Sequence, residues 1–516
     1  MQAEPEYAPG YEELYEEFLA EAAAINDLGN VAGLLSWDQD TYMPAGGAEG
    51  RGQQMATISS IRHARLTSPR MAELLAALEA ADLPPHSVEA AMVREGRRAY
   101  GRATKLPTRL VEELARAGSS ARQAWVQARE ANDYRLFAGE LGRMLALKRE
   151  EADAVGYTTE RYDALLDEYE PGARAADVRV VFSQLREDQV RLLGDITGSS
   201  VTLSDAALRG PYPAAAQAAY VQSLAAKVGY DFRRGRLDET IHPFAESVGL
   251  DDVRITTRYD TDNLATALFG TLHEVGHALY EQGIDPGLAR TPLAHGAGLG
   301  VHESQSRLWE NLVGRSLPFW EGAYRGLQAA FPAQLGGVDL STFYRAVNVA
   351  HPSLVRTEAD EVTYNLHILV RFELETALLA GDLAVTDLPG AWNERYRDYL
   401  GIEPANDVDG CLQDIHWSVG LFGYFPTYAL GNLMSVQLYE AAERELGDLD
   451  APIRAGDFGP LLGWLRRNVH AHGSRYSPPE LLQRATGASL DAGPYLRYLR
   501  GKFGRLYDLQ ATQESP

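Results

Sequence analysis

Helical periodicity runs through most of this chain and limits the folds that it can adopt. Residues 11–26 are rich in Glu, Ala and Leu and poor in β-branched residues, a composition that favours helix. The same pattern recurs at residues 71–81, 109–154, 175–196 and 214–228. β-Branched residues gather instead at residues 233–259, which predicts the few strands. The sequence therefore predicts a mainly α protein with one small β element.

Domain boundaries leave little trace in the sequence. Glycine and proline punctuate the helical stretches, as at Pro84-Pro85, but no long Pro/Gly/Ser linker or charge block divides the chain. We find no repeat with a period of about 20 to 50 residues, which disfavours a helical solenoid. We therefore expect residues 1–516 to form a single domain, or two helical lobes that pack tightly against each other.

The charge balance disfavours several classes of partner. The 516 residues contain 48 Lys and Arg against 72 Asp and Glu, and this net charge of −24 disfavours nucleic acid or an anionic membrane as the main partner. The acidic N-terminal region lacks the basic end of a signal peptide, and no apolar run approaches the roughly 18 residues of a membrane-spanning helix. The single cysteine, Cys411, excludes an intramolecular disulfide. These features predict a cytoplasmic protein.

A His-Glu-Xaa-Xaa-His pattern is the most informative chemical feature of the chain. It consists of His273, Glu274 and His277, in a helical stretch that is predicted to follow an N-cap at Thr261 or Asp262 and to end at Gly283. On a helix, residues i and i+4 share a face, so both imidazoles can bind one ion while the carboxylate lies beside them. This is typical of zinc peptidases, although two surface histidines on a charged face would give the same pattern.

A catalytic zinc needs a third protein ligand, for which Glu303 is the candidate. It follows His277 by 26 residues (303 − 277), after a turn that contains three glycines, and a returning helix could present it to the ion. The neighbouring His302 is a candidate for binding substrate or for orienting the Glu303 carboxylate, and could itself be a ligand. A dinucleotide-binding interpretation of the glycines is disfavoured because no strand precedes them. Carboxylates are expected to orient the zinc histidines; Asp360 and Asp252 are the candidates, with helix-cap or surface roles as the alternatives.

Six ordered motifs resemble those of the carboxypeptidase Taq family of metallocarboxypeptidases. The resemblance extends over most of the chain, from Ser36-Trp37-Asp38 to Asn468-Val469-His470. The motifs are His242-Pro243-Phe244, Asp252-Val253-Arg254-Ile255-Thr256, His273-Glu274-Val275-Gly276-His277, His302-Glu303-Ser304-Gln305, Val355-Arg356-Thr357-Glu358-Ala359-Asp360 and Gly410-Cys411-Leu412-Gln413-Asp414-Ile415-His416-Trp417.

The resemblance implies a large helical metallopeptidase fold with a deep substrate groove and the β element near the active site. It also implies a divalent metal, zinc with cobalt often accepted, and removal of single residues from peptide C-termini with broad specificity. A homodimer is common in the family. By position, His273, His277 and Glu303 match the metal ligands and Glu274 matches the general base, and we expect the catalytic motifs within residues 242–428.

A carboxypeptidase must recognise a free terminal carboxylate, which the planar guanidinium of arginine can bind with two hydrogen bonds. Arg356 is the first candidate; alternatively, it caps the start of a helix over residues 357–380. Arg254 is the second candidate, and a structural ion pair with a neighbouring acid is equally compatible with its position.

The oxyanion of peptide hydrolysis needs hydrogen-bond donors. His416 and the tyrosines Tyr424 and Tyr428 follow the zinc motif in the order seen in related helical metallopeptidases. We favour Tyr424 over Tyr428, although simple packing in the core would also explain either tyrosine. Cys411 is disfavoured as a nucleophile because a free cysteine is usually a small buried apolar residue.

Three other functions remain open at this stage. An oligopeptidase or a peptidyl-dipeptidase on the same scaffold would carry the same zinc motif, and a non-catalytic helical binding protein could keep a decayed site. An aminopeptidase is disfavoured because the Gly-Xaa-Met-Glu-Asn segment typical of such enzymes is missing from the sequence. In each peptidase case we expect peptide substrates and no nucleic acid or membrane partner.

Overall fold

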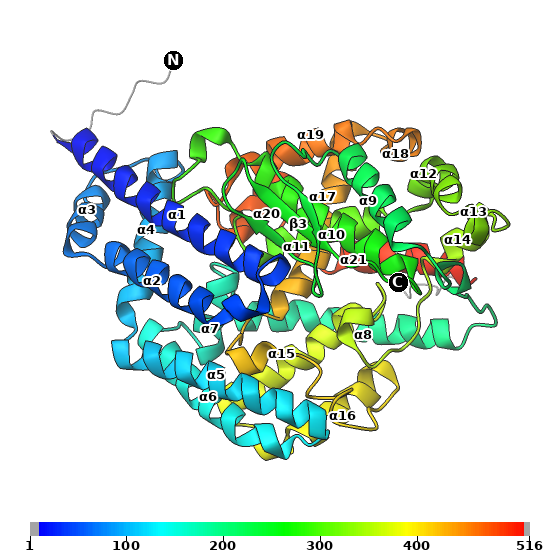
Figure 1. Ribbon diagram of the computed structural model, residues 1–516, viewed down its shortest axis with the longest axis horizontal. Helices are drawn as coiled ribbons and strands as arrows, with labels where there is room; N and C mark the ends of the chain where they lie inside the picture. The colour runs from blue at the N-terminus through cyan, green and yellow to red at the C-terminus, as the bar shows by residue number, and fades with distance from the viewer. Residues whose placement is uncertain (1–9, 510–516) are drawn as a thin grey trace, which may run out of the picture. The chain divides into compact units, whose positions relative to one another are not determined.

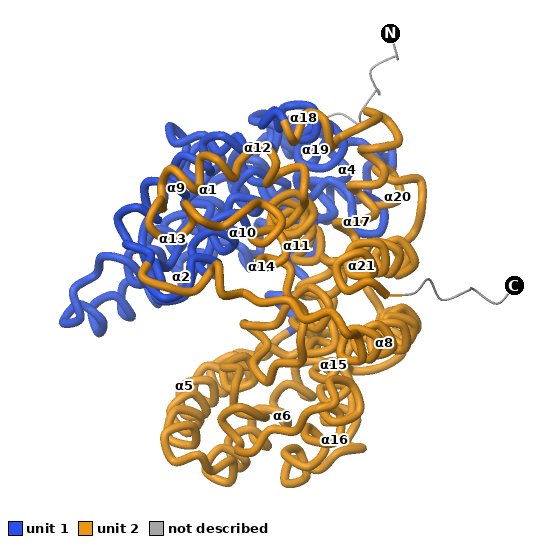
Figure 2. Tube along the Cα trace, turned by 90° about the vertical axis from the view of Figure 1, so that its right-hand side faces the viewer, with its two compact units in different colours: residues 1–105, 212–297, 455–481 blue, residues 106–211, 298–454, 482–516 orange. Residues whose placement is uncertain are grey.

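The computed structural model describes residues 10–509 and confirms the predicted fold class (Figure 1). Helices, short 3-10 and π segments included, make up 69% of these described residues and strands 3%. The described residues separate into two compact units, each built from three segments of the chain (Figure 2). None of the described helices is both long and apolar enough to cross a lipid bilayer.

Unit 1 comprises residues 1–105, 212–297 and 455–481, as far as they are described. It contains a three-stranded sheet in the order β1-β3-β2, in which β1 runs parallel and β2 antiparallel to β3. Its helices and strands are α1 (Tyr11–Thr41), α2 (Ala48–Leu66), α3 (Pro69–Glu79), α4 (Val88–Lys105), α9 (Ala214–Val228), β1 (Leu237–Glu239), β2 (Ala245–Ser247), β3 (Val253–Thr257), α10 (Leu264–Gly283), α19 (Gly459–Asn468), η8 (His470–His472) and the first part of α20 (Pro478–Thr486).

Unit 2 comprises residues 106–211, 298–454 and 482–516, as far as they are described. All of the short helix α18 (Asp450–Ala455) except its last residue belongs to this unit. Its other helices are α5 (Thr108–Ala131), α6 (Arg135–Val155), α7 (Arg161–Tyr169), α8 (Ala175–Thr197), α11 (Leu299–Arg307), the π-helix η4 (Leu308–Val313), α12 (Leu317–Ala330), α13 (Pro332–Leu335), α14 (Leu340–Ala346), η5 (Arg356–Glu358), α15 (Tyr364–Ala380), α16 (Leu388–Leu400), η7 (His416–Val419), α17 (Pro426–Leu446) and α21 (Gly493–Leu506).

The sheet lies within the segment predicted to hold the strands and supports helix α10. Strand β3 is buried and packs against α10, and the Thr271 hydroxyl of the helix donates a hydrogen bond to the Thr257 hydroxyl of the strand at 3.0 Å. Helix α10 begins later than predicted, because the side chain of Asn263 caps it by accepting from the Ala265 amide at 3.1 Å. Gly283 is its last residue, as expected.

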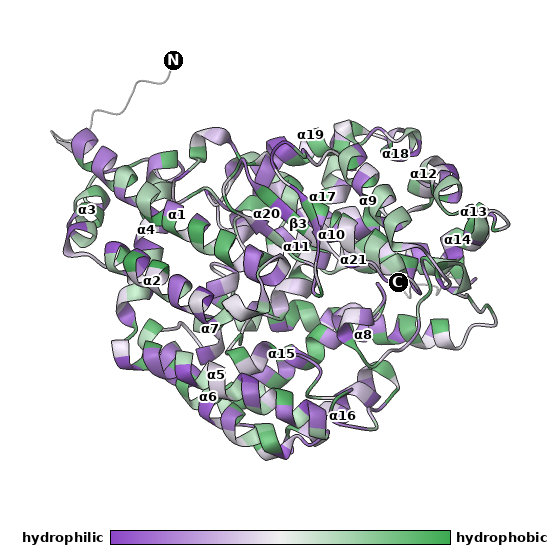
Figure 3. Ribbon diagram, in the orientation of Figure 1, coloured by the Kyte–Doolittle hydropathy of each residue, from purple (hydrophilic) through white to green (hydrophobic). Residues whose placement is uncertain are grey.

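Two helix boundaries differ from the predicted ones for local reasons. The stretch over residues 109–154 is divided into α5 and α6 by Asn132, which adopts the left-handed conformation with φ 50° and ends α5. Alternating polar and apolar residues show clearly on both helices (Figure 3). The helix expected over residues 357–380 begins only at Tyr364, so Arg356 lies in the separate short helix η5 and does not cap α15.

Helices α15 and α17 form much of the core of unit 2. Thirteen of the 17 residues of α15 are buried, including its polar residues Arg371 and Glu375. A helix that is buried on nearly all sides must satisfy such polar groups within the protein. The hydrogen bonds of these buried polar residues therefore hold the surrounding loops in place.

Candidate metal centre and its surroundings

Helix α10 places His273 and His277 one turn apart on the same face. Their ring centroids are 4.9 Å apart, both side chains are half-buried, and Glu274 between them is buried. The pairing follows directly from the i, i+4 spacing. The Glu274 carboxylate and the two imidazoles are therefore held on one helix.

Helix α11 carries Glu303, which is only 4% exposed. The Arg307 guanidinium donates to one carboxylate oxygen (Nε to Oε1, 2.6 Å) and the Ser306 hydroxyl donates to the other (Oγ to Oε2, 3.1 Å). Helix α17 packs closely against α11 at Gly431, where an added Cβ would lie 2.5 Å from the Cβ of Glu303. Glycine is therefore required at position 431 for the Glu303 side chain to keep its place.

The three predicted ligands are brought together. Ligand atoms of His273, His277 and Glu303 all lie within 4.8 Å of one another. Two imidazole nitrogens and one carboxylate oxygen form a donor set that suits zinc and leaves a coordination position open for water or substrate. The residues present thus fit a catalytic divalent metal, while His302 lies half-buried next to Glu303 on α11.

The start of α11 is held by a buried carboxylate that sequence reasoning missed. Glu170 follows α7 and accepts a hydrogen bond from the Gly300 amide at 2.7 Å, at the positive end of α11. A Cβ at position 300 would lie within 2.9 Å of both carboxylate oxygens. Burial raises the pKa of Glu170 to about 7, against the Gly300 hydrogen bond that lowers it. The 130 residues between the partners explain why no local pattern indicated this contact.

Glu170→Gln is expected to change the pH dependence of stability. Because the folded protein holds this proton more tightly than the unfolded chain, the stabilising contribution is present below pH 4.5 and is lost as the pH rises through about 7. The glutamine variant lacks this loss, so its free energy of unfolding should rise relative to wild type by about 2 to 3 kcal/mol between pH 5 and pH 8. Urea denaturation of both proteins at pH 5 and pH 8 measures this difference. Glu168→Gln, at an exposed position, serves as the control. If the free energy of unfolding of Glu170→Gln changed with pH as that of wild type does, the expectation would be wrong.

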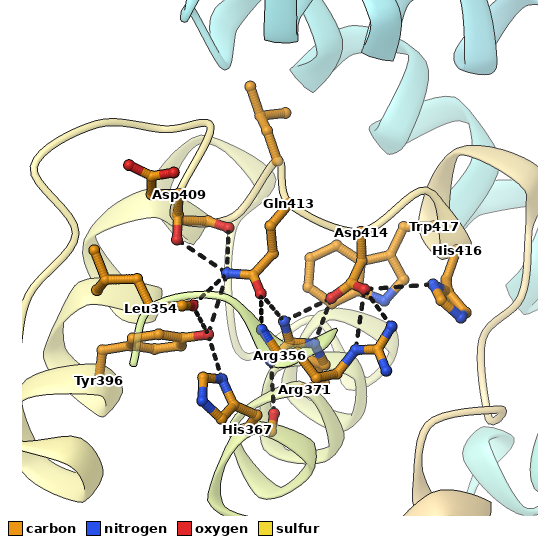
Figure 4. A network of polar contacts seen from close by, with 12 residues as sticks. Leu354, Arg356, His367, Arg371, Tyr396, Asp409, Gln413, Asp414, His416 and Trp417 are labelled. Atoms are coloured by element: carbon orange, nitrogen blue, oxygen red, sulfur yellow. Dashed lines mark hydrogen bonds and ion pairs between the residues drawn. The ribbon is translucent and has the colours of Figure 1, made fainter. Parts of the chain in front are cut away.

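Arg356 belongs to a buried network centred on Asp414 (Figure 4). Arg356 donates to Asp414 Oδ1 through Nε at 3.1 Å and Nη2 at 2.8 Å, while Arg371 donates through Nε to Oδ2 at 2.6 Å. Nη1 of Arg356 also donates to the Tyr364 hydroxyl at 3.2 Å. Burial tends to raise the pKa of Asp414, but the two guanidinium groups outweigh it and hold that pKa far below its usual range. Asp414 is therefore ionised at neutral pH.

The segment after Asp414 brings His416 and two tyrosines against this network. Nδ1 of His416 lies 3.7 Å from Asp414 Oδ1, and burial lowers the pKa of the imidazole to about 4 even though the Asp414 charge raises it. The His416 ring lies 5.5 Å from the Tyr424 ring and 6.5 Å from that of Tyr428. His416 is consequently neutral at pH 7.

Tyr424 and Tyr428 lie close enough to interact with each other. Their ring centroids are 5.4 Å apart, and a hydrogen bond with the Tyr428 side chain lowers the pKa of Tyr424, although burial raises it more. Burial also raises the pKa of Tyr428, and the charge of Glu303 raises both. Unit 2 thus gathers Glu303, Arg356 and the two tyrosines, and both hydroxyls stay protonated at neutral pH.

The other predicted residues have well-defined partners. Asp360 accepts hydrogen bonds from the amides of His351, Val362 and Thr363 and from the Thr363 hydroxyl, in the turn before α15, so a role beside a metal-binding histidine stays a prediction. Asp252 accepts from Nε and Nη2 of Arg254 at 2.8 and 2.7 Å, the ion pair foreseen as the alternative for Arg254.

Arg254 and Cys411 both lie in well-packed surroundings. The Arg254 guanidinium also lies 4.2 Å from the centre of the Trp37 ring. Cys411 is buried, and burial raises the pKa of its thiol, which keeps the sulfur protonated. A protonated, buried thiol agrees with the expectation that Cys411 is not a nucleophile.

Comparisons with known proteins cover nearly the whole chain. The sequence profile of the carboxypeptidase Taq (M32) metallopeptidases matches residues 17–503. Thermostable carboxypeptidase 1 of Thermus thermophilus is 48% identical over 95% of this chain and 98% of its own length, and carboxypeptidase 1 of Bacillus subtilis is 38% identical with the same coverage. The crystal structure of the M32 carboxypeptidase from Deinococcus radiodurans matches with a TM-score of 0.93 at 44% identity, over 96% of this chain and 100% of that one.

Proposed function

The chain belongs to the carboxypeptidase Taq (M32) family and is a metallocarboxypeptidase, and from this premise we propose that it releases single C-terminal amino acids from peptides with broad specificity. The observation that carries the proposal is the approach of His273, His277 and Glu303 to within 4.8 Å, with the buried Glu274 beside them. We further propose that the protein is a cytoplasmic homodimer.

His273, His277 and Glu303 would hold the metal, which we propose to be zinc, with cobalt accepted in its place. When bound, a divalent ion polarises the scissile carbonyl and lowers the pKa of water. The hydrogen bonds from Arg307 and Ser306 fix the Glu303 carboxylate, so the site is organised before the ion binds.

Glu274 is proposed as the general base. It takes a proton from the attacking water and passes it to the leaving amine, two transfers for which a buried carboxylate on a rigid helix is well placed. His416 and Tyr424 are proposed to donate hydrogen bonds to the oxyanion. The Tyr424 ring lies nearer to the His416 ring than Tyr428 does, 5.5 against 6.5 Å between centroids, which favours Tyr424 for this role.

Arg356 is proposed to bind the terminal carboxylate of the substrate. In the hydrogen-bonded group of Arg356, Arg371 and Asp414, two positive charges face one negative charge, so one positive charge remains for an anionic ligand. The two arginines differ because Arg371 also donates to the His367 carbonyl and to Gln413, and is fully buried. Arg254 and His302 are proposed as additional substrate-binding residues.

Timed mass spectrometry of a peptide digest tests the function directly. The expected result is a ladder of single C-terminal losses that stops with a chelator and resumes when zinc or cobalt is added. Internal cuts would identify an oligopeptidase, and losses of two residues at a time a peptidyl-dipeptidase. Stoichiometric zinc without any cleavage would indicate a non-catalytic binding protein.

Arg356→Gln should weaken recognition of the substrate carboxylate. We expect kcat/KM for a peptide with a free C-terminus to fall roughly 10- to 100-fold, since a charge-assisted hydrogen-bond pair is lost. Arg356→Lys keeps the positive charge but lacks the planar guanidinium, so its kcat/KM should lie between those of wild type and Arg356→Gln. We expect the same peptide with a C-terminal amide to be a poor substrate for wild type. Its kcat/KM should therefore fall little further in Arg356→Gln. Arg397→Gln, at an exposed ion pair with Glu403, is the control; equal losses on both peptides would contradict the assignment.

A further inference from the structure

A buried carboxylate on α15 has no part in the proposed metal binding, proton transfer or substrate recognition. Glu375 is fully buried and accepts three hydrogen bonds: from the Tyr162 hydroxyl at 2.7 Å, from Nε1 of Trp417 at 2.7 Å and from the Gly423 amide at 3.1 Å. Its donors come from three separate segments, namely α7, η7 and the turn before α17. One side chain therefore joins three parts of unit 2.

Two of the donors lie near the two ends of the segment of residues 416–424. Trp417 directly follows His416 and Gly423 directly precedes Tyr424, so Glu375 fixes the chain beside each of the two proposed oxyanion donors. The Trp417 side chain extends from the same loop as Asp414 and His416 (Figure 4). The distance between the His416 and Tyr424 rings, 5.5 Å, thus depends on contacts that Glu375 makes.

Helix α7 supports the same turn. Gly423 has φ +85°, and an added Cβ would lie 2.6 to 2.8 Å from backbone atoms of Leu165 and Leu166. The Tyr424 ring also packs edge-on against Tyr169 at 5.1 Å between centroids. The turn therefore lies directly on α7, the helix that supplies the Tyr162 donor.

The chemistry of Glu375 favours a positioning role over simple core packing. Burial raises its pKa to about 7, against the lowering effect of its three donors, so this carboxylate is costly to keep in the core. An apolar residue would avoid that cost but would leave the Trp417 and Gly423 N–H groups without this acceptor.

We propose that Glu375 is a positioning residue that holds His416 and Tyr424 in place for the transition state by binding Trp417 and Gly423. The inference rests on the proposed role of Tyr424 in oxyanion binding. A shift of either donor lowers transition-state stabilisation more than substrate binding, so the effect should appear in kcat.

The test combines Glu375→Gln with Tyr424→Phe in a double-mutant cycle, using steady-state kinetics on an unblocked peptide. Glu375→Gln should lower kcat roughly 10-fold with KM changed less than about 2-fold. In the Tyr424→Phe background the loss should be clearly smaller, because only the contribution through His416 remains. Glu373→Gln is the matched control: it lies on the same helix and accepts from Tyr399 and two arginines at a more exposed position, and should keep kcat within about 2-fold.

The outcomes are distinguishable. Unchanged kcat in Glu375→Gln, or a loss as large in the Tyr424→Phe background as in wild type, would overturn the positioning role alone. Normal kcat in Tyr424→Phe would overturn the oxyanion role and the positioning role with it. If Glu375→Gln does not fold, Trp417→Phe removes one donor and keeps an aromatic ring, and the same cycle with that variant decides.

Discussion

Glu274→Gln is expected to lower kcat by roughly 10²- to 10⁴-fold while the protein keeps its metal. The substitution preserves the size of the side chain and its place on α10, next to His273 in the chain and one turn from His277. It removes only the ability to take up a proton. Because neither proposed imidazole ligand changes, metal content measured by atomic absorption should match that of wild type.

Helix α10 also offers a closely matched control for this experiment. Glu281 lies seven residues further along the same helix and is 6% exposed, as is Glu274, so Glu281→Gln makes the same chemical change in a similar environment. Its kcat should stay within a few-fold of wild type. A Glu274→Gln variant with near-normal kcat, or one that had lost its metal, would contradict the assignment of Glu274 as the base.

Glu303→Gln is expected to weaken metal affinity by more than roughly 100-fold and to abolish turnover at limiting metal. Substitutions of residues that merely orient a metal ligand cost about 10- to 100-fold in affinity, so loss of a ligand should cost more. Titration of the metal-free protein against a chromophoric chelator measures affinity without relying on activity. Wild-type affinity in this variant would exclude Glu303 as a ligand.

Glu303→Gln has a second effect that the control must separate. It takes one carboxylate from Arg307, whose side chain is 12% exposed, and breaking an ion pair with so little exposure costs up to about 3 to 5 kcal/mol of stability. Glu310 is the other carboxylate paired with Arg307, at 3.2 Å, so Glu310→Gln makes a similar loss without touching the proposed ligand set. Its metal affinity should stay close to wild type even if its stability falls.

Local chemistry explains which parts of the structure the sequence predicts. The pairing of His273 with His277 needs only helical spacing, and the strands lie where β-branched residues gather. Spacing alone could only suggest Glu303 as the third ligand, and the family motif supported it, because Glu303 and the histidines belong to different segments of the chain. The division into α5 and α6 was missed because asparagine is tolerated within a helical pattern, and only its left-handed conformation marks the end of α5.

Contacts between distant segments could not be predicted. Glu170 and Gly300 are 130 residues apart, and Glu375 and Tyr162 are 213 apart. The sequence around each acid does not identify its distant partner. Their importance follows from burial, which is a property of the assembled fold, and so both carboxylates became apparent only in the structure.

The three-segment composition of unit 1 has a consequence for protein synthesis. Residues 455–481 complete this unit, and His470 within them packs against Tyr280 and closely approaches Gly283 of α10. The ribosome must add the 157 residues 298–454 after the second segment before the third begins, which takes roughly 8 to 30 s at about 5 to 20 residues per second. During that interval the helix with both histidines lacks part of its final packing, so unit 1 cannot complete its core until its last segment has been made.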